Sequence, residues 1–111
     1  MVENKLPKAV QLALMELKQS LAEVYGARLS GIHLFGSYAC GDFQPDSDVD
    51  ILIAPEGMVN PGKEINRVSE RVSDICLEYD VLIAIFPVTE DWLQVRKSPL
   101  FENVRREGVP L

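Results

Sequence analysis

The sequence has 111 residues, of which 47% are hydrophobic and 25% charged, and its formal net charge is −6 at pH 7. This length fits a single domain, residues 1–111, and the composition is typical of a folded globular protein and excludes a largely disordered chain. The negative charge disfavours general coating of DNA or RNA, because phosphate backbones would repel the protein at long range.

Cysteine usage and the apolar runs indicate the compartment. Two cysteines, Cys40 and Cys76, are too few for a disulfide framework. The first residues lack the pattern of a signal peptide, and no apolar run approaches the roughly 20 residues that span a bilayer. We therefore expect a cytoplasmic protein without a membrane partner.

The apolar pattern predicts alternating helices and strands. Apolar residues at three- and four-residue spacing predict helices over about 6–25, ending at Gly26, and over about 62–78. Short apolar runs predict strands over 29–35, from about 48 to 54, and from Asp80 to Pro87, and shorter helices are predicted for 89–95 and 98–106. This order predicts an α/β fold with a small mixed sheet. The first two strands are expected to pair antiparallel, because their connection is too short for a helical crossover.

The informative stretch is LFGSYACGDFQPDSDVDILI, residues 34–53. Side chains alternate along a strand, so Asp48 and Asp50 share one face of an otherwise apolar strand. Two like charges there are costly unless a cation lies between them or one takes up a proton. Mg²⁺ prefers such carboxylate ligands, and a pair of Mg²⁺ ions suits phosphoryl transfer. Asp80 is the candidate third carboxylate, because it opens the next apolar strand.

The turn between these strands predicts a phosphate contact. Gly36 allows a phosphate to approach the backbone closely, and Ser37 adds a hydroxyl and an N–H group. The aspartates and this turn together predict a site for a nucleoside triphosphate and two Mg²⁺ ions.

The spacing of these residues resembles a known family. The chain has Gly36–Ser37, then ten residues, then Asp48-Val49-Asp50. This pattern is similar to the signature of the DNA polymerase β-like nucleotidyltransferase superfamily, and Asp80 matches the third carboxylate of that superfamily. The ending SPLFENVRREGVPL resembles the minimal nucleotidyltransferase (MNT) branch, which includes the MntA-like antitoxins of HEPN/MNT toxin–antitoxin pairs.

That resemblance implies a specific activity. An antitoxin of this kind would transfer AMP from ATP to a hydroxyl, expected to be a tyrosine, of a partner HEPN toxin and release pyrophosphate. Asp48 and Asp50 would bind the metal ions, and Asp80 would bind the metal nearer the acceptor and help to activate the hydroxyl. Gly36 and Ser37 would bind the triphosphate.

One position departs from the family pattern. Related proteins often carry an arginine where this chain has Cys40, and a thiol cannot neutralise phosphate. Four other basic residues are candidates for that task, namely Arg67, Arg71, Arg105 and Arg106.

Other readings remain open. The protein could be an antitoxin that neutralises its partner by binding alone, or a transferase that acts on a small-molecule hydroxyl. The nucleotide, the acceptor and the choice between a homo- and a hetero-oligomer are not determined by the sequence. Five further residues are interpreted as loop or packing residues rather than catalytic ones: Asp42, Asp46, His33, Trp92 and Phe101.

Overall fold

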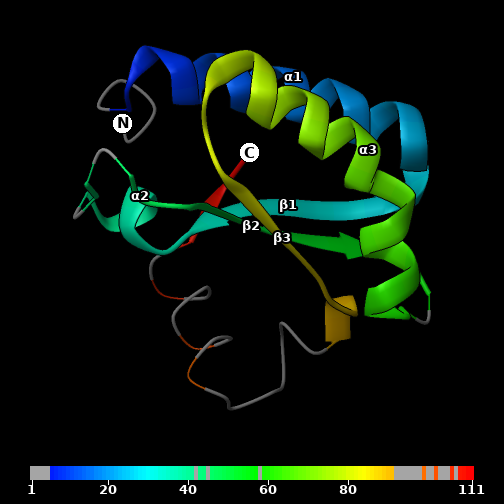
Figure 1. Cartoon of the computed structure of the whole chain (residues 1–111). Helices are drawn as coiled ribbons and strands as arrows, with labels where there is room; N and C mark the ends of the chain where they lie inside the picture. The colour runs from blue at the N-terminus through cyan, green and yellow to red at the C-terminus, as the bar shows by residue number, and fades with distance from the viewer. Residues whose placement is uncertain are drawn as a thin grey trace.

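The computed structural model describes residues 6–41, 43–44, 46–57, 59–91, 99, 102, 106 and 108–111. Two long helices and a sheet account for most of them (Figure 1). In chain order the elements are α1 (Lys8–Tyr25), η2 (Gly26–Arg28), β1 (Leu29–Phe35), α2 (Ser37–Cys40), β2 (Val49–Pro55), α3 (Pro61–Tyr79), β3 (Ile83–Pro87) and β4 (Val109–Pro110).

The sheet is mixed and has the strand order β3-β2-β1-β4. β1 and β2 are antiparallel, as their short connection predicts, whereas β2 and β3 are parallel, because α3 provides the crossover between them. The sequence did not predict β4, a two-residue strand that pairs antiparallel with β1. The small mixed α/β sheet predicted from the sequence is confirmed.

Both long helices cover the same face of the sheet (Figure 1). The apolar side of α1 packs with Leu34, Val49, Ile51 and Ile53 in one buried core. Leu52 and Ala54 alternate with the core residues of β2 and are also buried, at 0% and 1% exposure. The predicted division of β2 into two faces therefore holds, and its central place in the sheet explains why both faces are apolar.

Capping residues set the ends of the two helices. Gly26 ends α1 with φ 56°, as predicted, and its N–H donates to the carbonyl of Ala22. Asn60 caps α3, and its side-chain oxygen accepts a hydrogen bond from the backbone N–H of Lys63 at 3.3 Å.

The third strand begins later than the sequence predicted. Asp80 is the C-cap of α3 in the left-handed conformation, and β3 starts only at Ile83. An aspartate tolerates that conformation better than most residues, so the helix runs on to Tyr79 and Asp80 makes the turn. The two predicted C-terminal helices lie largely outside the described residues, although residues 90–91, 99, 102 and 106 are helical.

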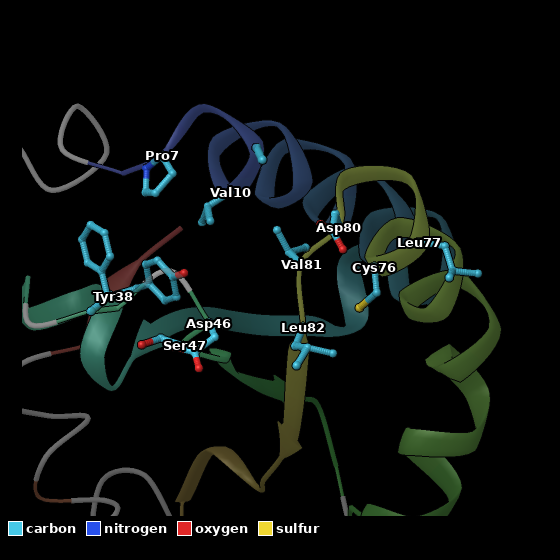
Figure 2. Close-up of a pocket in the computed structure, with 12 residues that line it drawn as sticks. Pro7, Val10, Tyr38, Asp46, Ser47, Cys76, Leu77, Asp80, Val81 and Leu82 are labelled. Carbon is cyan, nitrogen blue, oxygen red and sulfur yellow. The ribbon is translucent and has the colours of Figure 1, made fainter.

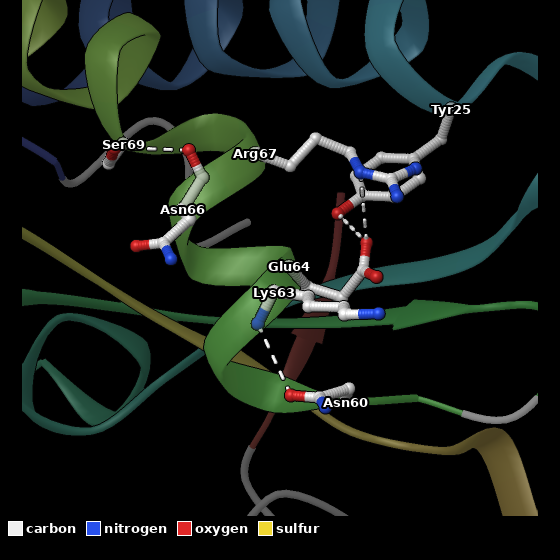
Figure 3. A network of polar contacts seen from close by, with 7 residues as sticks. All are labelled: Tyr25, Asn60, Lys63, Glu64, Asn66, Arg67 and Ser69. Atoms are coloured by element: carbon white, nitrogen blue, oxygen red, sulfur yellow. Dashed lines mark hydrogen bonds and ion pairs between the residues drawn. The ribbon is translucent and has the colours of Figure 1, made fainter.

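A buried polar contact joins the end of α1 to the start of α3 (Figure 3). The Tyr25 hydroxyl donates to Oε1 of Glu64 at 2.7 Å, and Arg67 Nε lies 3.7 Å from the same oxygen. Burial, followed by the hydrogen bond to Glu64, raises the pKa of Tyr25. This contact joins the last residue of α1 to the first turn of α3, close in sequence to the start of β1 at Leu29.

Candidate active site

The turn after β1 brings Gly36 against the carboxylate of Asp50. Asp50 lies opposite Phe35 in the antiparallel ladder, so the residue after Phe35 passes beside its side chain. Gly36 has φ 76° and ψ −153°, a region open essentially to glycine alone. A Cβ at this position would collide with Oδ2 of Asp50. The glycine therefore makes room for the carboxylate and directs the chain into Ser37, the first residue of α2.

Asp48 and Asp50 form a pair of interacting carboxylates. Asp50 is half-buried on β2, and Asp48 is exposed just before that strand. Burial and then the negative charge of Asp48 raise the pKa of Asp50. In the ladder Asp50 pairs with Phe35 and Ala84, which places it on the sheet face opposite α1 and α3. A cation between the two carboxylates would remove the repulsion that raises this pKa.

The donor set fits Mg²⁺, the ion that the fold family implies. Mg²⁺ in nucleotide sites commonly takes one or two carboxylates, and phosphate oxygens and water complete its shell. Asp48 and Asp50 supply two hard oxygen ligands beside a glycine turn that leaves the Asp50 carboxylate uncovered. Within the described part of the chain, no three histidine, cysteine or acidic side chains are grouped to hold a metal ion. The structure thus brings together Asp48 and Asp50 but does not place Asp80 with them in one ligand group.

Asp80 instead lines a cleft together with Asp46 and Tyr38 (Figure 2). The cleft has a volume of about 700 Å³ and lies between the start of α1, the end of α3 and the loop before β2. Asp46 and Ser47, the two residues that precede Asp48, also line it. The complete lining is Pro7, Ala9, Val10, Tyr38, Phe43, Asp46, Ser47, Cys76, Leu77, Asp80, Val81 and Leu82.

Tyr38 links this cleft to the Gly36–Ser37 turn. It follows Ser37 directly, is buried, and stacks on Phe43 with ring centroids 4.6 Å apart. Burial, followed by the charges of Asp46 and Asp48, raises the pKa of Tyr38. The sequence analysis missed Tyr38 and Phe43 and treated Asp46 as a loop residue. The sequence contains no pattern that predicts contact between Tyr38 and Phe43, because the two rings stack only once the loop between them has folded.

Two of the basic residues proposed to replace the missing arginine form ion pairs between or within the long helices. Arg71 forms an ion pair with Glu23 at 2.7 Å, and Arg67 pairs with Glu64. Both pairs lie toward the Leu29 end of β1. The Gly36–Ser37 turn follows the other end of this seven-residue strand, about 20 Å away, so these two arginines are not at that turn. Arg105, Trp92, Phe101, Asp42 and the side chain of Cys40 lie outside the described residues.

His33 occupies the middle of β1, and its structural interpretation agrees with its surroundings. Its ring is partly buried, Nδ1 has no hydrogen-bond partner among the described residues, and burial lowers the pKa of the imidazole. A neutral imidazole on a sheet is expected to pack rather than to exchange protons at pH 7.

The strand–turn–strand unit that carries Gly36, Ser37, Asp48 and Asp50 defines a class of phosphate-handling domain, and the sequence comparison identifies it. A family model described as the nucleotidyltransferase domain matches residues 14–96, so the chain belongs to the nucleotidyltransferase domain family. Asp48, Asp50 and Asp80 all fall within the matched range.

Two proteins of Methanocaldococcus jannaschii are similar to this chain along most of its length. The putative protein adenylyltransferase MJ0141 is 37% identical over 94 residues, which cover 85% of this chain and 90% of that protein. The putative protein adenylyltransferase MJ0604 is 32% identical over 97 residues, which cover 86% of this chain and 91% of that protein.

Solved structures share the fold at lower sequence identity. A crystal structure of a toxin–antitoxin with AMP-PNP superposes with a TM-score of 0.62 at 20% identity and covers 86% of this chain and 69% of the other. A tri-AMPylated Shewanella oneidensis HEPN toxin in complex with its MNT antitoxin gives a TM-score of 0.57 at 18% identity, with 90% and 69% coverage. Among the described residues, no helix is both long and apolar enough to span a membrane.

Proposed function

We propose that this nucleotidyltransferase is an antitoxin that transfers AMP from ATP to a tyrosine hydroxyl of a HEPN-type partner protein, with release of pyrophosphate. The observation that carries the proposal is the Asp48–Asp50 pair beside the Gly36–Ser37 turn. Two relatives named for protein adenylyl transfer and structural neighbours from toxin–antitoxin pairs support the choice of nucleotide and acceptor.

The assigned residues have distinct tasks in this proposal. Asp48 and Asp50 hold Mg²⁺, which would neutralise charge on the triphosphate when bound. Gly36 lets the phosphates approach the backbone, and Ser37 offers its hydroxyl and N–H group to them. The acceptor hydroxyl attacks the α-phosphorus, and the bond from that phosphorus to the pyrophosphate oxygen breaks. The reaction depends mainly on positioning and charge stabilisation, as is general for phosphoryl transfer.

Asp80 is assigned to the acceptor side of the reaction. It lines the cleft between α1, α3 and the loop before β2. From there its carboxylate would accept the proton of the acceptor hydroxyl.

The decisive experiment is label transfer with a matched carboxylate control. The purified chain is incubated with Mg²⁺, α-labelled ATP and the protein encoded by the adjacent gene. We expect the wild type to transfer label to the partner, and the transfer rate of Asp48→Asn to be lower by about a hundredfold or more. Asp74 is an exposed carboxylate on α3, and Asp74→Asn should keep the full transfer rate. Mg²⁺ with ATP should raise the melting temperature of the wild type and of Asp74→Asn, but not that of Asp48→Asn.

Two results would contradict the proposal in different ways. Full activity of Asp48→Asn would remove the metal role assigned to the pair. A tight complex without label, formed equally by wild type and Asp48→Asn, would favour an antitoxin that acts by binding alone.

A further inference from the structure

The cleft between α1, α3 and the loop before β2 has features that folding does not explain. Leu77 and Leu82 on its rim are 83% and 62% exposed, although each is a large apolar side chain. In Figure 2 Leu77 lies on the outer side of the end of α3, and Leu82 follows Val81 on the chain toward β3. Exposed apolar side chains gathered at a concave site commonly mark a contact with another molecule.

The charge of the cleft selects the kind of molecule. Asp46 and Asp80 supply two exposed carboxylates, and none of the described residues that line the cleft is basic. The C-terminal end of α3 adds the negative end of its helix dipole, and its last turn carries no basic residue. A triphosphate would be repelled here, so the cleft does not suit the phosphates of the nucleotide. A cationic ligand with an apolar body would be complementary.

The position of the cleft connects it to the reaction. Tyr38 forms one wall and is adjacent in sequence to Ser37, and Asp46 and Ser47 lead directly into Asp48. A peptide held in the cleft would therefore contact Asp80 and the two residues that precede Asp48.

We propose that this cleft is the docking site for the acceptor protein, and that it takes a segment in which a lysine or arginine stands next to apolar side chains. The basic side chain pairs with Asp46, the apolar side chains cover Leu77 and Leu82, and Asp80 stays available to the acceptor hydroxyl. This inference rests on the proposed function, since it assigns the cleft to the acceptor rather than to the nucleotide.

Binding is tested first, with ligands that cannot accept AMP. Acetyl-lysyl-leucyl-phenylalaninamide and its glutamyl counterpart are titrated into the isotope-labelled chain, and the backbone amide resonances are followed by NMR. The lysyl peptide is expected to shift the resonances of Leu77, Val81 and Leu82 with a Kd of about 1 mM, as for a short peptide with few contacts. The glutamyl peptide is expected to bind about tenfold more weakly, and added salt should narrow the difference.

Matched variants separate charge from apolar contact. Asp46→Asn should narrow the preference for the lysyl peptide, whereas Asp74→Asn, an exposed carboxylate away from the cleft, should leave it unchanged. Leu77→Ser with Leu82→Ser should weaken both peptides, and Met15→Ser, 68% exposed on α1, should weaken neither. Three results would overturn the proposal. The first is equal binding of the two peptides, and the second is the absence of a saturable shift at about 10 mM peptide. The third is that adenosine competes with the peptide and produces the same shifts.

A transfer assay distinguishes failure of this inference from failure of the proposed function. The tyrosyl analogue of the lysyl peptide is offered with α-labelled ATP and Mg²⁺. The Leu77→Ser, Leu82→Ser variant should raise the KM for the peptide severalfold while the KM for ATP stays constant. If Asp48-dependent label appears and that variant keeps its peptide KM, the docking site is wrong and the transferase stands. If no label appears but the NMR preference holds, the docking site stands and AMP transfer is wrong.

Discussion

The contact between Gly36 and Asp50 makes Gly36→Ala the sharpest test of the active-site geometry. The φ of 76° and ψ of −153° at Gly36 cost an alanine about 1–3 kcal/mol, and the new Cβ also meets Oδ2 of Asp50. The carboxylate must move away or the turn must shift. Because a displacement of about 1 Å at a reacting centre can cost a hundredfold in rate, we expect AMP transfer to fall by about that factor.

A second glycine separates the steric effect from the backbone effect. Gly26 has φ 56° and ψ −132° at the end of α1, and a Cβ there would meet no atom within 4 Å. Gly26→Ala should therefore lose a similar amount of stability in urea denaturation but keep its transfer rate. The reasoning would be refuted if Gly36→Ala retained wild-type activity, or if both variants lost activity in proportion to their loss of stability.

Two further predictions concern the packing of α1 on α3. Tyr25→Phe removes the hydroxyl that donates to Oε1 of Glu64, a residue that is 8% exposed, and of the two contacts to that oxygen leaves the one from Arg67. The free energy of unfolding, measured by urea denaturation, should fall by about 2 kcal/mol. A fall of less than about 0.5 kcal/mol would contradict a stabilising role for this hydrogen bond. The hydrogen bond that protonated Glu16 donates to the Glu78 carboxylate, then burial, then the negative charge of Glu78 raise the pKa of Glu16 above its ordinary value of 4.5. The wild type therefore loses stability as the pH rises through that raised pKa. Glu78→Gln should be more stable than the wild type above pH 4.5 and as stable as the wild type below it. Melting temperatures of both proteins, measured across this pH range, check the prediction. Identical pH profiles of the two proteins would exclude this repulsion.

Much of the fold and the centre of the candidate site could be predicted locally. The three- and four-residue spacing of apolar side chains places α1, and the short connection after β1 requires an antiparallel neighbour. The alternation of β2 places Asp50 and Leu52 on one face, and a glycine–serine turn near two carboxylates predicts a phosphate contact. These features depend on periodicity, chain length and side-chain chemistry, which neighbouring residues determine by themselves.

Only the tertiary structure decided how these parts meet. Asp80 reads as the start of a strand, yet α3 packs far enough along the sheet to make it a helix cap that faces the cleft. The two residues of β4 carry no strand signal and are ordered by pairing with β1. The Tyr38–Phe43 stack, the Glu64 contact and the cleft itself each join segments that are distant in sequence or separated by a turn. Such contacts depend on the packing of whole elements against one another, and that packing is not encoded in the pattern of any single segment.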